Sequence, residues 1–320
     1  MTQEKWLEMA ENVFRNDRER FVYQCLLIRM AEQKIIELYP SDKIQSPVHL
    51  SIGQEAVAVG LCAALRPDDL LFPTYRNHAL FLAKGGTLRA FFAELFGKET
   101  GGARGKAGSM HMLAPECGLM PATAVVASNL PVAVGAALAE RRKGGTRLVA
   151  AVFGDGATEE GVHHESLNMA AILNLPVLFV CEDNGYAVHA PVAQRQSYDL
   201  PALVARYGIG VSEIADGHDP EAVRDSIAAT IAAMRADGRP RYVVVKTYRY
   251  KEHVGPGDDF DAGYRSPRDL QSWLERDPLL RESEIVERLR PRVAAEIAEA
   301  VAFAEASPWP PLSSLHDLQA

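Results

Sequence analysis

Residues 147–185, RLVAAVFGDGATEEGVHHESLNMAAILNLPVLFVCEDNG, decide the fold of this chain. The apolar run at 147–153 predicts a strand, 154–156 a tight turn, 159–174 a helix and 176–181 a second strand. Strands that are apolar on both faces are typical of parallel sheets covered by helices. The stretch therefore predicts a βαβ unit within an α/β fold, a doubly wound, mainly parallel sheet flanked by helices.

Two polar side chains follow the two predicted strands, Asp155 after the first and Asn184 after the second. If these strands are neighbours, both side chains project at the carboxyl edge, where open α/β sheets bind ligands. A carboxylate, an amide oxygen and an exposed carbonyl suit magnesium or calcium, and magnesium completes its shell with phosphate oxygens. Gly154 and Gly156 let the backbone approach a phosphate, and the next helix N-terminus offers N–H donors. Turn chemistry explains either motif alone, but their pairing favours a metal and phosphate site.

The rest of the chain is predicted to be mainly helical, with one more buried strand at 242–246. We expect helices at 4–39, 53–65, 78–84, 88–96, 129–142, 200–207 and 220–237, and a helical tail over 267–306. These boundaries divide the chain into an N-terminal helical extension (1–45), an α/β domain (46–267) and a C-terminal helical tail (268–320). The glycine-rich stretch 97–109 is predicted to be a loop. It is either a flexible connector or a loop ordered over an anionic ligand by Arg104 and Lys106.

Composition narrows the classes of protein that remain. The chain has 320 residues, 48% of them hydrophobic and 24% charged, with a net charge of -8. An acidic chain without a basic stretch is a poor candidate for binding nucleic acid or an anionic membrane. The longest apolar runs are too short to span a bilayer, and the N-terminus lacks a signal-peptide core. The four cysteines form no C-x-x-C pair, which is typical of a reducing compartment, so we expect a cytoplasmic protein.

Several motifs together resemble one family. The stretch from GDG to DNGY (154–186) is similar to the thiamine-diphosphate signature, and five more motifs follow the order of the family's alpha subunits. They are HLSIGQEAVAVG (49–60), PTYRNHALFLAKG (73–85), GKAGSMHM (105–112), NLPVAVGAALA (129–139) and KTYRY (246–250). Over about residues 20–270 the chain resembles the alpha subunit of the decarboxylating component of 2-oxo acid dehydrogenases, such as pyruvate, branched-chain and acetoin dehydrogenases. The resemblance implies the thiamine-diphosphate-binding fold, in its diphosphate-binding module.

The resemblance also implies how the cofactor is held. Asp155, Asn184 and the backbone carbonyl of Tyr186 correspond to the ligands of a Mg²⁺ ion in the family. The backbone N–H groups of Gly156 and Ala157 correspond to donors to the diphosphate. These residues coincide with the edge that the βαβ unit predicts from its own pattern.

Further site residues are implied on other segments. Tyr75 and Arg76 match a pair that binds the diphosphate, which suits a bidentate guanidinium. The backbone near Ala124 and Val126 would pass over the aminopyrimidine ring. His78 lies where relatives carry a histidine that lines the site, and the alternative is a helix-start histidine bonded to backbone.

The segment after KTYRY departs from the family pattern. Relatives commonly continue H-G-H-S with a mobile loop that reaches the active site, whereas this chain reads KEHV at 251–254. The second histidine is retained as His253, and it would approach the diphosphate or the substrate together with Arg249. Val254 replaces a serine that is phosphorylated in some relatives, so we do not expect such control at this position.

The resemblance implies a partner chain. In the family a beta subunit supplies the glutamate that activates the cofactor, the two subunits form an α2β2 heterotetramer, and a lipoyl acyltransferase is a further partner. We therefore expect an enzyme that decarboxylates a 2-oxo acid and is active only with a beta subunit. Two alternatives are a split transketolase or carboligase using the same cofactor without a lipoyl partner, and a non-catalytic cofactor-binding subunit. The alanine-rich stretch 122–139 is a candidate interface, although core burial explains it equally well.

Overall fold

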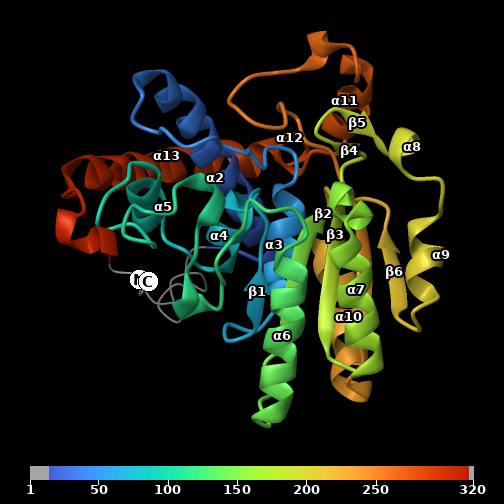
Figure 1. The fold of residues 1–320 in the computed structure, drawn as a ribbon. Coiled ribbons are helices and arrows are strands. Elements are labelled where there is room, and N and C mark those ends of the chain that lie inside the picture. Colours follow the sequence, from blue (N-terminus) through green and yellow to red (C-terminus); the bar gives the residue numbers. More distant parts are fainter. Residues whose placement is uncertain (1–13, 317–320) are drawn as a thin grey trace.

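A five-stranded parallel sheet lies at the centre of the molecule in the computed structural model, which describes residues 14–316 (Figure 1). The strands follow the spatial order β1-β2-β3-β7-β6. Their bounds are β1 Leu70–Phe72, β2 Val149–Gly154, β3 Val177–Asp183, β7 Arg241–Lys246 and β6 Gly210–Ile214. Within the described residues every pairing in this sheet is parallel, which confirms the predicted mainly parallel α/β fold.

The predicted βαβ unit is confirmed. β2 and β3 are direct neighbours, Gly154 pairs with Glu182, and the crossover helix α7 spans Gly161–Ile172. The helix is shorter than the predicted 159–174, because the backbone from Asp155 to Glu159 forms a 3-10 turn before α7 begins. The strands β1 and β6 were not predicted. β1 has only three residues, and β6 is a partly exposed edge strand without an apolar run.

Helices cover both faces of the sheet (Figure 1). One face packs against α6 (Asn129–Arg142), α7 and α9 (Leu200–Ala205), and the other against α3 (Glu55–Ala64) and α10 (Pro220–Asp237). Successive residues of β2 alternate between the two cores. Ala150 and Val152 join the cluster around α3 and α10, whereas Ala151 and Phe153 join the cluster around α6 and α7. The period of two along a strand thus fills both layers.

The terminal helices pack on the α3 side of the sheet. The long helix α13 contacts α2 and α5. The bounds are α2 Asp17–Leu38, α4 His78–Lys84, α5 Leu88–Leu95, α11 Pro267–Leu274, α12 Pro278–Arg281 and α13 Ser283–Ala306. Part of the first predicted helix, 4–39, lies outside the described residues. The division at 45 and 267 stays a prediction. None of the described helices combines the length and the apolar character needed to cross a membrane.

The glycine-rich loop is ordered around a side chain of the protein itself. The carboxylate of Glu94 in α5 accepts N–H groups from Ala103, Gly105, Ala107 and Gly108 at 2.7 to 3.1 Å. The loop is therefore not the flexible connector of the first alternative. It encloses an anion as the second alternative required, but this anion is Glu94 rather than a ligand.

Candidate functional site

Asp155 lies at the carboxyl end of β2 with one oxygen unused. The residue is 2% exposed. Its Oδ2 pairs with Arg195 at 2.5 Å, while its buried Oδ1 has no hydrogen-bond partner. Burial, reinforced by the nearby Asp183, raises the pKa of the Asp155 carboxyl to about 6. A buried acceptor without a partner is costly, so the geometry fits a site that is completed by a ligand.

Asn184 follows β3 at the same edge of the sheet. Its amide nitrogen donates to Gln54 Oε1 at 3.0 Å, and its Oδ1 accepts the N–H of Tyr186 at 3.1 Å. Tyr186 begins the hairpin of β4 (Tyr186–Ala187) and β5 (Ala190–Pro191), which lies over the end of the sheet (Figure 1). A Cβ on Gly156 would meet the Cβ of Ala187 at 2.7 Å, so glycine is required for this approach. The structure thus brings Asp155, Asn184 and Tyr186 to one edge.

A cluster of three rings and one guanidinium forms a second part of the site. The ring of His49 lies 4.5 Å from that of Tyr75 and 5.2 Å from that of His253, and the Tyr75 and His253 rings are 5.8 Å apart. Arg76 donates from Nη2 to the backbone oxygen of His253 at 3.1 Å and from Nη1 to that of Leu50 at 2.6 Å. The predicted residues Tyr75, Arg76 and His253 are therefore neighbours, although they come from distant segments.

His49 belongs to this cluster but was not predicted as a site residue. It opens the HLSIGQEAVAVG motif, so the motif's match to the family is the signal that could have identified it. The residue is 7% exposed, and its Nδ1 is buried without a hydrogen-bond partner. Like Asp155, His49 therefore has a buried polar atom that a ligand would satisfy.

The electrostatics of the cluster favour an anion. Burial, reinforced by Arg76, lowers the pKa of His49 and of His253 to about 3. Burial also lowers the pKa of Arg76 to about 10, which leaves it charged at neutral pH. Two neutral imidazoles therefore stand beside one buried cation. Glu32 and Glu182 already act on this buried charge, and an anionic ligand would add a further partner of opposite sign.

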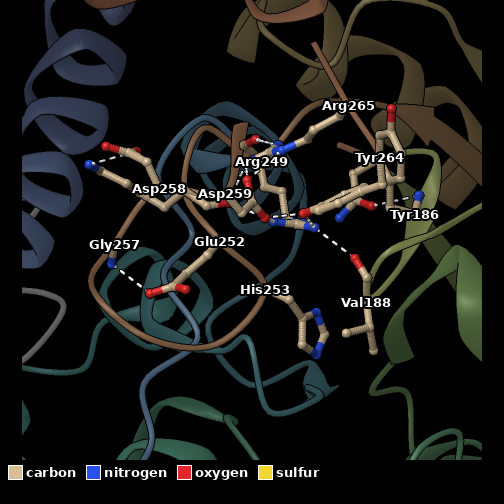
Figure 2. Close-up of polar contacts among 12 residues, drawn as sticks. Tyr186, Val188, Arg249, Glu252, His253, Gly257, Asp258, Asp259, Tyr264 and Arg265 are labelled. Atoms are coloured by element: carbon tan, nitrogen blue, oxygen red, sulfur yellow. Dashed lines mark hydrogen bonds and ion pairs between the residues drawn. The ribbon is translucent and has the colours of Figure 1, made fainter. Parts of the chain in front are cut away.

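The loop that carries His253 is held by a buried network, which Figure 2 shows. Arg249, 1% exposed, donates to Asp259 at 3.0 Å and to the backbone oxygen of Val188 at 2.8 Å. Asp259 also accepts from Arg265 at 2.6 Å, and Tyr264 donates to Asp259. Arg249 was predicted to approach a ligand, but here its terminal nitrogens tie the loop to the β4–β5 hairpin.

His78 does not line the cluster. Its ring has no exposed surface, its Nδ1 lies 3.0 Å from Glu32 Oε1, and its Nε2 lies 2.8 Å from Ser109 Oγ. The alternative, a histidine bonded to backbone, is also not what the structure shows, because both partners are side chains. In this placement both ring nitrogens of His78 contact side chains of other segments, and its role in the site stays a prediction.

Ala124 and Val126 lie on a surface segment beside Tyr75. Thr123 forms a parallel bridge with Thr74, which places 123–127 next to the cluster. Val126 is 39% exposed. Their role over the aminopyrimidine ring stays a prediction.

Solved structures of similar fold include transketolases. A transketolase from Leishmania mexicana matches with a TM-score of 0.57 and 19% identity, over 90% of this chain and 46% of the other. A transketolase variant from Pichia stipitis matches with a TM-score of 0.60 and 15% identity, over 91% and 48%. At this identity the similarity shows the fold alone. This chain spans about half the length of those transketolase chains.

Sequence comparison gives the family. The model of the dehydrogenase E1 component family matches residues 23–313. The alpha subunit of the acetoin:2,6-dichlorophenolindophenol oxidoreductase of Bacillus subtilis is 36% identical, over 93% of this chain and 92% of the relative. The pyruvate dehydrogenase E1 component subunit alpha of Zymomonas mobilis is 35% identical, over 92% and 86%. The chain therefore belongs to the dehydrogenase E1 component family, among the alpha subunits of the thiamine-diphosphate-dependent 2-oxo acid dehydrogenases.

Proposed function

We propose that this chain is the alpha subunit of an α2β2 heterotetramer that decarboxylates a 2-oxo acid. It would bind thiamine diphosphate through Mg²⁺ and pass the acyl group to a lipoyl acyltransferase. One observation carries the proposal. Asp155 has an unpaired, buried oxygen at the sheet edge that also holds Asn184 and Tyr186.

The residues at this edge fit a magnesium ion. Asp155 Oδ1, Asn184 Oδ1 and the carbonyl of Tyr186 are all oxygen donors, and Mg²⁺ prefers few protein oxygens together with phosphate oxygens. Within residues 14–316 no group of three or more His, Cys, Asp or Glu side chains is placed to hold a metal. A metal at this edge would therefore rely on the amide and carbonyl oxygens beside the one carboxylate.

The diphosphate would lie between this edge and the ring cluster. Gly156 and Ala157 would donate hydrogen bonds to it from their backbone N–H groups, and Arg76 and Tyr75 would donate hydrogen bonds from their side chains. When bound, thiamine diphosphate supplies the thiazolium carbon that attacks the substrate carbonyl and holds the electron pair left after decarboxylation. The chain's own residues would bind, orient and cover the reacting groups.

His253 is the residue we expect closest to the reaction. Its ring is neutral at pH 7 because burial and Arg76 lower its pKa to about 3. A neutral imidazole both donates and accepts a hydrogen bond, so it can orient a substrate carboxylate or move a proton at its Nε2. His49 and Tyr75 pack against it and set its orientation. The loop at 251–265 would keep water out.

Exposed apolar side chains lie beside the site. Val125 is 69% exposed and Val132 59%, both near the start of α6. On the adjoining helix α7, Met169 is 51% exposed and Ile172 66%, but both lie near the end of that helix, at the amino edge of the sheet. Exposed apolar side chains mark protein interaction surfaces, and we propose that the beta subunit covers the exposed valines near the start of α6. One side of α6 is buried and the other faces solvent, so core burial alone does not account for the alanine-rich stretch 122–139.

The metal assignment is tested on the chain assembled with its beta-type partner. Asp155→Ala should abolish Mg²⁺-dependent binding of thiamine diphosphate in titration calorimetry, because it removes the only carboxylate of the proposed donor set. Asp183→Asn is the matched control. Asp183 is the neighbouring buried acid, but it pairs with Lys246 and belongs to no proposed ligand set. Unchanged affinity in the Asp155 variant would show that the metal assignment is wrong.

The two-chain assignment has its own test. The purified chain alone should not consume a 2-oxo acid with an artificial electron acceptor, and addition of the beta-type chain should restore consumption. Size-exclusion chromatography with light scattering should give the mass of α2β2. Full activity of this chain alone would overturn the proposal, since the activating glutamate would then have to lie within it.

A further inference from the structure

Arg195 binds the carboxylate that the proposed metal site depends on. This last residue of α8 (Val192–Arg195) uses all three guanidinium nitrogens. Nη2 contacts Asp155 Oδ2 at 2.5 Å, Nη1 pairs with Glu159, and Nε donates to the backbone oxygen of Ala190 at 2.9 Å. The side chain is only 11% exposed. A guanidinium held at three points is a fixed element of the site rather than a mobile surface cation.

The same side chain joins two parts of the sheet edge. Asp155 follows β2, whereas Asn184 and Tyr186 begin the connection that continues through the β4–β5 hairpin to Arg195. The N–H of Val192 donates to the carbonyl of Gly185 at 3.0 Å and closes this connection. Arg195 therefore ties the segment that carries two proposed metal ligands to the third ligand.

We propose that Arg195 is a positioning residue for the metal and diphosphate site. It fixes Oδ2 of Asp155 so that Oδ1 faces the ligand. This inference rests on the proposed function. Carboxylates that bind metals are themselves usually held by hydrogen bonds, and loss of such a partner weakens metal binding. The guanidinium takes one carboxylate oxygen and leaves the other without a partner. That division leaves one carboxylate oxygen open to a ligand, as a positioning contact requires.

The test uses the assembled enzyme and three variants. The half-saturating concentration of Mg²⁺ for thiamine diphosphate binding is measured by calorimetry, and Mn²⁺ binding in the presence of the cofactor by electron paramagnetic resonance. Arg195→Gln should raise the half-saturating metal concentration about 10- to 100-fold. Arg195→Lys should recover part of this loss. Glu159→Gln is the matched control, because it removes the other anion on Arg195 but leaves Asp155 paired, and we expect a shift of less than about threefold.

Excess metal separates positioning from a general structural role. At saturating Mg²⁺, the Arg195→Gln variant should bind thiamine diphosphate nearly as tightly as the unmodified enzyme. A loss of affinity that excess metal cannot restore would overturn the proposal in favour of a folding role. An unchanged half-saturating Mg²⁺ concentration would also overturn it. A lower one would do so as well, because it would mean that Arg195 competes with the metal for Asp155. If Arg195→Gln does not assemble, Arg195→Lys carries the same measurement. Absence of Mg²⁺-dependent binding in the unmodified enzyme would refute the proposed function itself, which distinguishes the two failures.

Discussion

Glu94 holds the glycine-rich loop with a single carboxylate. The side chain is 2% exposed, and it accepts N–H groups from Ala103 at 2.8 Å, Gly105 at 3.0 Å, Ala107 at 2.7 Å and Gly108 at 3.1 Å. Each carboxylate oxygen serves two donors. A substitution that changes only the acceptors therefore tests whether this carboxylate orders the loop.

Glu94→Gln keeps the size of the side chain but leaves one acceptor oxygen in place of two. The amide oxygen serves at most two of the four N–H groups, and the amide nitrogen faces the other two. A hydrogen bond to a charged group contributes about 1.5–3 kcal/mol, so the loss of two costs about 3–6 kcal/mol. The whole chain is stabilised by about 5–15 kcal/mol. We therefore expect the loop to open locally before the chain unfolds.

Amide hydrogen exchange of residues 97–112 measures this opening directly. A cost of about 3–6 kcal/mol predicts faster exchange by about 10²- to 10⁴-fold. Glu99→Gln is the matched control, because Glu99 lies on the same loop and pairs with Arg104 near the surface, and we expect less than about a tenfold change. Unchanged protection in the Glu94 variant would refute the claim that its carboxylate orders the loop.

Three further predictions concern pH, cofactor binding and the His253 loop. Burial, followed by His164, lowers the pKa of His163 to about 3, whereas an unfolded histidine titrates near 6.5. The unfolded state therefore binds more protons, so stability falls as pH decreases from about 6.5 toward 3. His163→Gln should make the thermal midpoint less sensitive to pH between about 7 and 5 at fixed protein concentration, and an unchanged dependence would contradict this. Arg76→Ala should weaken cofactor binding, measured by calorimetry, by about 1.5–3 kcal/mol. His253→Ala should instead lower turnover more than cofactor affinity. If the His253 variant and the unmodified enzyme had equal turnover at cofactor saturation, His253 would not belong to the site. Asp259→Asn should speed proteolysis at 251–258, because both arginines on Asp259 lose an anionic partner, and an unchanged cleavage rate would show that the network does not hold the loop.

The parts of the fold that the sequence predicted are those with a local cause. β2 and β3 are runs of six and seven residues, almost entirely buried on both faces, and their composition alone predicts a covered parallel sheet. α10 (Pro220–Asp237) has Asp219 as its N-cap and Gly238 as its C-cap, and these residue types predict both ends of a helix from the sequence. β1 and β6 lacked such signals. β1 has three residues, and pairing with β2 and with Leu119 on its other side, rather than a local sequence pattern, makes it a strand.

The residues of the candidate site also divide into those with a local sequence signal and those without one. Asp155 and Asn184 were predicted because a βαβ crossover determines where both strands end. The positions of His78 and Arg249 were not predicted, because the residues that they contact lie on segments distant in the sequence. Glu32, which lies 3.0 Å from His78, is on a different helix, and the carbonyl of Val188 that accepts from Arg249 is on the β4–β5 hairpin. A sequence pattern shows that a charge is present but not whether another segment already pairs with it.

These tertiary contacts meet on one segment, the connection from Asn184 to Arg195. At its end, Arg195 binds Asp155 at the proposed metal edge. At its middle, Val188 accepts a hydrogen bond from Arg249, whose other contacts hold the loop with His253. Val188 has a φ of 53°, which is unfavourable for a β-branched residue and persists only where surrounding contacts impose it. The connection is thus constrained from both sides. The same short segment therefore contacts both the proposed metal edge and the network that holds the loop with His253.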